Sequence, residues 1–220
     1  MNTKSSMVFE DAHFQCWKKR VEKNGNSFVS IDVIAEISRD GSNLFGAFLD
    51  CVLMTPEGHE IPRCVLIGDD SVVIVPVLFC EDNNEIYTLM VEQRRIIDGG
   101  LSIEFPSGGV GRSGKAISMA CQEISEELHM SITTEELLPL ASDSIKINPS
   151  FSGDIVNFFY FKKYVSRSFL EEMEGKNTGC HHDFEYIKVR VYKMSDVADH
   201  LTSSALIGIK LLERVMNRVF

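Results

Sequence analysis

Residues 105–130 read FPSGGVGRSGKAISMACQEISEELHM and join a glycine-rich turn to a helix. Pro106 and the glycines that follow it exclude a regular element before residue 115. Beyond that point the apolar residues recur at helical spacing, at Ile117, Ala120, Cys121, Ile124 and Leu128. The stretch therefore predicts a loop that leaves backbone groups free for a ligand, followed by an amphipathic helix.

Three glutamates, Glu123, Glu126 and Glu127, are expected on the side of this helix that faces away from the apolar stripe. Residues three and four apart are neighbours on a helix, so their carboxylates repel one another unless a cation lies between them. A set of oxygen ligands without His or Cys suits Mg²⁺, or alternatively Mn²⁺, and disfavours zinc. The alternative is an acidic face that is simply solvated, as most charge runs are.

The same segment resembles the Nudix box, in which Gly, five residues, Glu and seven residues precede Arg-Glu-aliphatic-any-Glu-Glu-any-Gly-aliphatic. Gly108 matches the first glycine, and Met130 closes the pattern. The residues that match its Glu-aliphatic-any-Glu-Glu core are Glu123, Ile124, Glu126 and Glu127. The resemblance implies that the three glutamates and the backbone carbonyl of Ser107 hold the metal, and that the glutamates serve catalysis.

Three positions depart from this pattern: Gly114 replaces the first Glu, Gln122 replaces Arg, and His129 replaces the closing Gly. In the family the first Glu and the Arg resemble a structural ion pair. Losing both partners together is less damaging than losing one, because no unpaired charge remains. Gln122 cannot position a carboxylate as an Arg fork does, which keeps open the alternative of a catalytically weak or inactive Nudix-like binding module or complex subunit.

Two further motifs lead into the glycine-rich turn. EQRR at residues 92–95 precedes EFPSG at residues 104–108, which resembles an arrangement in sugar-nucleotide members of the family. The resemblance implies that Arg95 and Gly108 contact the substrate, with Glu104 beside the metal loop. The alternative is that Arg94 and Arg95 are surface charges.

The loop at residues 145–154, which contains INPSFSGD, is the second chemical candidate. Its last residue, Asp154, matches the acid of a loop that carries the general base in diphosphatases of the ADP-sugar type. A carboxylate on a mobile loop can be brought to the site once substrate is bound. The alternative is an Asp that caps the backbone of a turn.

The rest of the chain reads as sheet and helix. Strands are expected at residues 29–37, 44–54, 63–67, 72–80, 86–93, 101–105 and 155–161, and helices at residues 14–22 and 168–174 and near the C-terminus. Trp17 and Phe45 are expected in the core rather than on a nucleobase. We predict two domains: residues 1–68, a helix with a small antiparallel β subdomain, and residues 69–220, the Nudix domain.

The composition of the chain limits the classes of partner that it is expected to bind. Asp and Glu number 32 against 22 Lys and Arg, a net charge of −10, which argues against nucleic acid and anionic membranes. The 6 cysteines form no CxxC pair and no apolar signal segment opens the sequence, which favours a reducing, cytoplasmic location.

The predicted fold class is therefore α/β: a Nudix fold with a mixed β-sheet sandwiched between helices and a small N-terminal antiparallel β subdomain. The resemblance to the ADP-sugar and UDP-sugar diphosphatases implies hydrolysis of a nucleoside diphosphate sugar by a homodimeric, Mg²⁺-dependent enzyme.

Overall fold

The computed structural model describes residues 6–38, 44–96, 99–111, 115–179, 185–199 and 203–217. The chain forms two compact units. The first comprises Met1–Ser71 with Val110–Gly114 and Ile145–Val156, and the second comprises Val72–Gly109, Lys115–Ser144 and Asn157–Phe220. The two later segments that join the first unit were not foreseen from the sequence.

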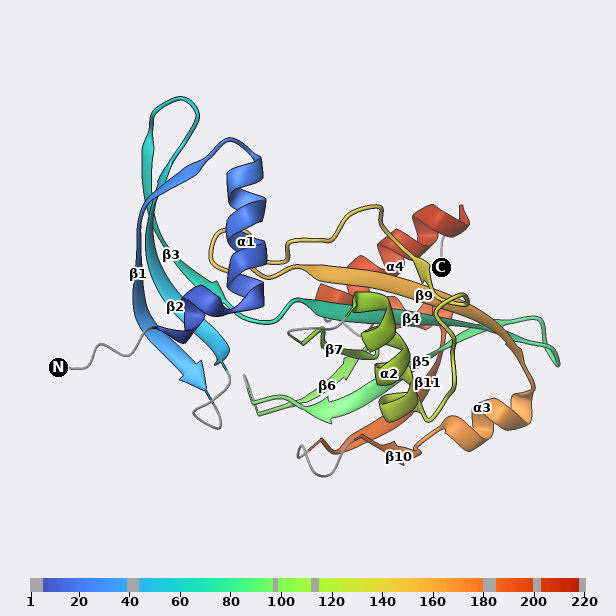
Figure 1. Ribbon diagram of the computed structural model, residues 1–220. Helices are drawn as coiled ribbons and strands as arrows, with labels where there is room; N and C mark the ends of the chain where they lie inside the picture. The colour runs from blue at the N-terminus through green and yellow to red at the C-terminus, as the bar shows by residue number, and fades with distance from the viewer. Residues whose placement is uncertain are drawn as a thin grey trace. The chain divides into compact units, whose positions relative to one another are not determined.

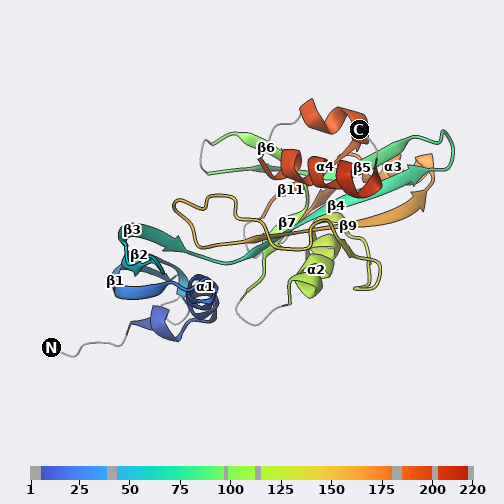
Figure 2. The same cartoon turned by 90° about the horizontal axis from the view of Figure 1, so that it is seen from above.

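The first unit is a three-stranded antiparallel sheet covered by a helix (Figures 1 and 2). Its helices are η1 (Met7–Glu10) and α1 (Ala12–Lys23), and its strands, paired in the order β1-β2-β3, are β1 (Ser27–Ser38), β2 (Leu44–Met54) and β3 (Glu60–Ile67). Asp11 caps α1 by accepting hydrogen bonds from the backbone N–H groups of His13 and Phe14. The predicted helix and three strands of this region are confirmed.

Aromatic packing forms the core of this unit. Phe14 and Trp17 of α1 lie on the sheet with their ring centroids 5.7 Å apart, and Trp17 also packs on Phe28 of β1 at 5.2 Å. Trp17 is buried as predicted, whereas Phe45 is 52% exposed, so the prediction of a buried Phe45 is wrong. A β-bulge explains the difference. The pairing of β1 with β2 passes from Ile37–Gly46 to Ser38–Leu44, which leaves Phe45 without a partner residue on β1.

The second unit is built on an eight-stranded mixed sheet, in which β4 and β9 run in the same direction (Figure 1). Its main path has the order β10-β11-β5-β4-β9-β8, while β6 pairs with β5 and β7 pairs with β4. The strands are β4 (Ser71–Cys80), β5 (Ile86–Arg94), β6 (Leu101–Glu104), β7 (Ser107–Gly109), β8 (Leu138–Pro139), β9 (Val156–Val165), β10 (Asn177–Thr178) and β11 (Ile187–Lys193). The strands predicted at residues 72–80, 86–93, 101–105 and 155–161 are confirmed to within a few residues.

Helices cover both faces of this sheet. Figure 2 shows α2 (Ala116–Leu128) on one face and α4 (Ser203–Met216) on the other, while α3 (Arg167–Met173) and η3 (Met194–Asp199) follow β9 and β11. A β-carbon on Gly208 of α4 would lie 3.1 Å from both Phe105 and Val75, so the glycine lets α4 approach the sheet closely. Among the described residues, no helix is long and apolar enough to cross a membrane.

Candidate functional site

The glutamate helix α2 is anchored by the residues that the sequence pattern placed in the core. Ala120, Ile124 and Leu128 are fully buried. The helix ends at His129, which adopts the left-handed conformation with φ 51° and ψ 36° and donates its backbone N–H to the carbonyl of Ile124. This is the conformation for which the family pattern uses Gly, and histidine adopts it at some cost.

The three glutamates do not share one environment. Glu123 and Glu126 are partly exposed, but Glu127 is only 3% exposed, so the expectation that all three face away from the buried stripe is wrong for Glu127. Its side chain reaches the short strand β7. There, Glu127 Oε2 accepts a hydrogen bond of 3.0 Å from the backbone N–H of Ser107.

Gly108 of the same short strand makes room for the second glutamate. A β-carbon on Gly108 would lie 1.9 Å from Glu123 Oε1 and 2.1 Å from its carboxyl carbon. A side chain at this position would push the Glu123 carboxylate aside. The carboxylates of Glu123 and Glu127 therefore both meet the Ser107–Gly109 strand, one on an α-carbon and the other on a backbone N–H.

The electrostatics of this arrangement are unfavourable without a cation. Burial, reinforced by the charge of Glu126 and then of Glu185, raises the pKa of Glu123 to about 7. Burial and the charge of Glu123 also hold the pKa of Glu127 well above its usual range, against the opposing hydrogen bond from Ser107. The charge of Glu126 thus makes Glu123 harder to ionise, and the charge of Glu123 does the same to Glu127.

Glu185 is a carboxylate that the sequence reasoning missed. It lies in the loop that precedes β11, and its charge raises the pKa of both Glu123 and Glu127. A fourth acid therefore contributes to the field at the glutamates. The only local signal was an acidic residue in a polar loop, which the sequence alone does not connect to α2.

Gln122 occupies the position at which the family pattern has Arg. Its side-chain Nε2 donates a 2.8 Å hydrogen bond to Glu126 Oε1, four residues along the helix. The amide thus still holds a glutamate, although it brings no charge. Gly114, the other half of the expected replacement, lies outside the described residues.

Arg95 and Glu104 form a two-pronged ion pair across the β5–β6 hairpin. Arg95 Nε lies 2.9 Å from Glu104 Oε1, and Arg95 Nη2 lies 2.5 Å from Glu104 Oε2. Burial raises the pKa of Glu104, but the hydrogen bonds from Arg95 and Ser102 outweigh it and leave that pKa below its ordinary value. The hydrogen bond to Glu104 likewise raises the pKa of Arg95, so both groups stay charged.

These contacts leave the roles of Arg95 and Glu104 as predictions. Arg95 is bound to a carboxylate, yet its guanidinium is also within the field of Glu127 and Glu185. It is therefore a cation near the acidic cluster. An arginine in such a place can bind a phosphate with donors that its carboxylate partner leaves free.

Asp154 belongs to the first unit, whereas the glutamates belong to the second. Its Oδ1 accepts a 2.7 Å hydrogen bond from the backbone N–H of Gly68, and its own N–H donates to Ser152 Oγ. This is the backbone-capping arrangement that the sequence allows as the alternative to a general base. Its catalytic role stays a prediction.

The chemistry of the donor set fits a hard divalent cation. Carboxylate oxygens are the ligands that Mg²⁺ and Mn²⁺ prefer, and the raised pKa values of Glu123 and Glu127 mark a place where positive charge would be stabilised. In the part of the chain that the structure describes, no three acidic, His or Cys side chains are already arranged as a metal cage. Glu126 is turned to Gln122 and Glu127 to Ser107, so their carboxylates would have to rotate to share one ion.

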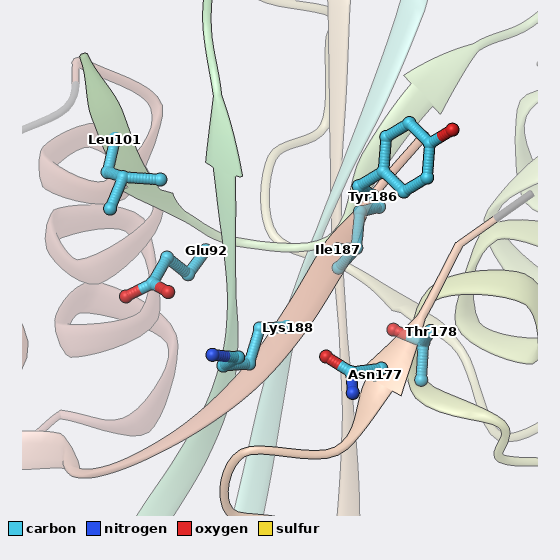
Figure 3. A pocket seen from close by; sticks show the side chains of 7 residues that line it. All are labelled: Glu92, Leu101, Asn177, Thr178, Tyr186, Ile187 and Lys188. Carbon is cyan, nitrogen blue, oxygen red and sulfur yellow. The ribbon is translucent and has the colours of Figure 1, made fainter. Parts of the chain in front are cut away.

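A pocket of about 370 Å³ lies in the second unit (Figure 3). It extends from Leu101 of β6 to Asn177 and Thr178 of β10, with Ile187 of β11 between them, and Tyr186, Glu92 and Lys188 complete its lining. Thr178 connects the pocket to the backbone of α2, because its Oγ1 donates a 2.6 Å hydrogen bond to the carbonyl oxygen of Glu127. The pocket therefore lies directly next to the last turn of the acidic helix.

Comparison with known proteins gives two similarities. No protein-family model matches the chain. The sequence is 24% identical over 206 residues to Nudix hydrolase 14, a chloroplastic protein of Arabidopsis thaliana, in an alignment that covers 85% of this chain and 66% of that protein. The chain thus spans about two thirds of the length of this relative.

Among solved structures, the chain is similar to the crystal structure of an ADP compounds hydrolase. The TM-score is 0.59, over 87% of this chain and 94% of that chain, at 10% sequence identity. This match confirms the predicted fold class. The chain is therefore homologous to a plant Nudix hydrolase and has the fold of an ADP compounds hydrolase.

Proposed function

We propose that the protein is a Nudix-type hydrolase that cleaves the pyrophosphate bond of a nucleoside diphosphate sugar, of the ADP-ribose, ADP-glucose or UDP-glucose type. The observation that carries this proposal is the convergence of Glu123 and Glu127 on the Ser107–Gly109 strand, with Glu123 against the α-carbon of Gly108. Carboxylates held at such a cost are expected where a cation and a polyanion bind. The similarity to a Nudix hydrolase and to an ADP compounds hydrolase supports the same reaction class.

In this proposal Glu123, Glu126, Glu127 and the Ser107 carbonyl would hold Mg²⁺, or alternatively Mn²⁺. Such an ion, when bound, neutralises charge on the phosphate oxygens and makes water a better nucleophile. Arg95 binds a phosphate oxygen with the guanidinium donors that Glu104 leaves free. Glu104 holds Arg95 in place, and Gly108 lets the pyrophosphate approach the backbone.

The proposed reaction needs one proton acceptor. A water oxygen bonds to one phosphorus, the bond from that phosphorus to the bridging oxygen breaks, and the products are a nucleoside monophosphate and a sugar phosphate. The water's proton passes to a carboxylate. Asp154 and Glu185 are the two candidates, and the coupling of Glu185 to Glu123 and Glu127 favours Glu185.

The adjacent pocket supports a substrate with an organic group of moderate size. Its volume of about 370 Å³ lies within the range of small-molecule sites. Leu101 and Tyr186 provide apolar surface, and Asn177 and Lys188 provide hydrogen-bond donors. A nucleoside or a sugar attached to the pyrophosphate would have both kinds of contact.

The second candidate is a Nudix-like binding module with little or no turnover. It is favoured by the Gln122 amide, which bonds Glu126 without supplying the charge of the arginine in the family pattern. The retained glutamates argue for the enzyme, because a chain released from catalysis has no physical reason to keep three mutually repelling carboxylates. Release of monophosphate from a panel of sugar nucleotides with Mg²⁺ distinguishes the two: an enzyme turns over at least one of them, and a binding module binds without turnover.

A homodimer also remains part of the proposal. Exposed apolar side chains gather on β1 and β2 of the first unit, namely Val29, Ile34, Ile37 and Phe45. A second copy of the chain would cover them. Analytical ultracentrifugation would show a species of twice the chain mass if this is right, and a monomer at micromolar concentration if it is wrong. The cytoplasmic location stays a prediction as well.

A further inference from the structure

The first unit contains a cavity of its own, which no part of the proposed reaction uses. It measures about 240 Å³ and lies between α1, β2 and the segment Ile145–Val156. We call it the Trp17 pocket, and its walls include Trp17, Arg20, Asn24, Asn26 and Lys146. All of these residues belong to the first unit, so the pocket does not depend on the glutamates.

The walls of the Trp17 pocket are fixed by hydrogen bonds. The backbone of the Ile145–Val156 segment is bound to β3 through Leu66, whose N–H donates to the carbonyl of Phe151 and whose carbonyl accepts from Gly153. Arg20 Nη2 also donates to the Gly153 carbonyl at 2.8 Å. A β-carbon on Gly153 would lie 2.6 Å from the Trp17 ring, so the segment is packed directly against the indole. The cavity is therefore preorganised.

The charge of the lining is positive. Arg20 and Lys146 line the cavity, and no acidic side chain does so among the described residues. Arg20 is partly balanced by Asp70 at 3.4 Å, whereas the ammonium of Lys146 has no ion pair or hydrogen bond in the described part of the chain. In a protein of net charge −10, such a site attracts an anion locally.

A donor also remains unused in the wall. Trp17 is 8% exposed, and its indole N–H has no hydrogen-bond partner among the described residues. The indole N–H is not among the fully buried atoms without a partner in the described part of the chain, so it is open to solvent. This donor is therefore available to a molecule in the cavity.

Hydrogen-bond acceptors line the Trp17 pocket at the end of α1. The Nδ2 of Asn24 donates to the Arg20 carbonyl at 3.1 Å, and the Nδ2 of Asn26 donates to the Val21 carbonyl at 3.2 Å. Each amide thereby presents its Oδ1 as an acceptor, which suits hydroxyl groups. The cavity thus combines cations, a free N–H donor, apolar walls and amide acceptors.

We infer that the Trp17 pocket is a second ligand site, which binds a sugar phosphate. The phosphate group would lie at Lys146 and Arg20, the carbon skeleton against Trp17, and the hydroxyl groups at Asn24 and Asn26. A cavity of 240 Å³ holds a molecule of this size and is too small for a whole sugar nucleotide.

The single tryptophan of the chain reports on this site directly. Ribose 5-phosphate, ribose and inorganic phosphate are titrated separately against the full-length protein in the presence of a chelator, while Trp17 fluorescence is recorded. Ribose 5-phosphate is expected to change the signal saturably, ribose to leave it unchanged, and inorganic phosphate to bind more weakly. No saturable change with ribose 5-phosphate, or equal binding of phosphate and ribose 5-phosphate, overturns the inference.

Two matched variants locate the binding. Lys146→Met removes the unpaired cation and should weaken ribose 5-phosphate binding by about tenfold or more, as expected for one charge-assisted hydrogen bond. Lys19→Met removes the same charge from an exposed position on α1 outside the pocket and should bind as the unaltered protein does. Equal affinities of the two variants would contradict the site. Because the chelator removes the metal, the result is independent of whether the glutamates catalyse hydrolysis.

Discussion

The carboxylate of Glu123 lies on the α-carbon of Gly108, so close that a β-carbon there would be 1.9 Å from Glu123 Oε1. Gly108→Ala should therefore push this carboxylate aside. Because the carboxylate is the end of a flexible side chain, the free energy of unfolding should fall by only about 1 kcal/mol, the low end of the range for overpacking. Urea unfolding measures the change. In a Glu123→Ala background the same substitution should cost little, because the clashing group is gone. Equal costs in the two backgrounds would show that the two residues do not touch.

The ion pair of Arg95 and Glu104 should respond asymmetrically to the loss of either partner. Arg95→Ala leaves a carboxylate that is only 9% exposed without its guanidinium, at a cost of about 1–3 kcal/mol. Glu104→Gln leaves Arg95 free to reach water, since its side chain is 41% exposed, and should cost less. The free energy of unfolding of each variant tests this order. If Glu104→Gln lowers the free energy of unfolding more than Arg95→Ala does, Glu104 is not the more buried partner of the pair.

Thr178 and Thr88 form a matched pair of buried threonines. Thr178 Oγ1 donates to the carbonyl of Glu127 in the last turn of α2, whereas Thr88 Oγ1 is buried without a partner among the described residues. Thr178→Val should cost about 1–2 kcal/mol, because it leaves a buried helix-end carbonyl without its donor. Thr88→Val should be neutral or stabilising. Thermal unfolding of the two variants gives the comparison, and equal melting temperatures would contradict it.

The sequence predicted those parts of the fold that local periodicity specifies. Helix α2 and strands β4, β5 and β9 follow from apolar spacing. The burial of Glu127 did not follow, because it depends on how β7 packs against α2. The joining of Ile145–Val156 to β3 is a long-range pairing with no local signal.

In the candidate site, too, only the features with a local sequence signal could be predicted. The spacing of Glu123, Glu126 and Glu127 predicted an acidic cluster, but the contact of Glu123 with Gly108 was not predicted, because it depends on how β7 packs against α2. Glu185 is separated from the cluster by more than fifty residues of sequence, so only the tertiary fold connects them. The bond between Gln122 and Glu126 is local, and helical spacing alone would have been enough to predict it.

The raised pKa values of Glu123 and Glu127 predict how the stability of the chelated protein depends on pH. The folded-state pKa of Glu123, about 7, lies above that of an unfolded chain. The stabilisation from its protonated form is therefore complete in acid below the unfolded pKa and is lost as pH rises through about 7. Melting temperature in chelator should fall between about pH 5 and about pH 8. Mg²⁺ should raise it more at the higher pH, where it must displace fewer protons.

The control for this prediction removes the titrating groups. In Glu123→Gln/Glu127→Gln the fall in melting temperature between the two pH values should shrink, and Mg²⁺ should have little effect at either. A double variant with the pH profile and Mg²⁺ response of the unaltered protein would assign both effects to other residues.

The most direct test of the central claim is the rate of Mg²⁺-dependent release of nucleoside monophosphate, measured for the unaltered protein, Glu127→Gln and Glu172→Gln. The panel contains ADP-ribose, ADP-glucose and UDP-glucose, with dinucleoside polyphosphates as a contrasting class. Glu172 is an exposed residue of α3 and serves as the matched control. We expect turnover of at least one sugar nucleotide, retained in Glu172→Gln and reduced by about a hundredfold or more in Glu127→Gln, with no loss of melting temperature. Unchanged turnover in Glu127→Gln would contradict the assignment of the glutamates to catalysis.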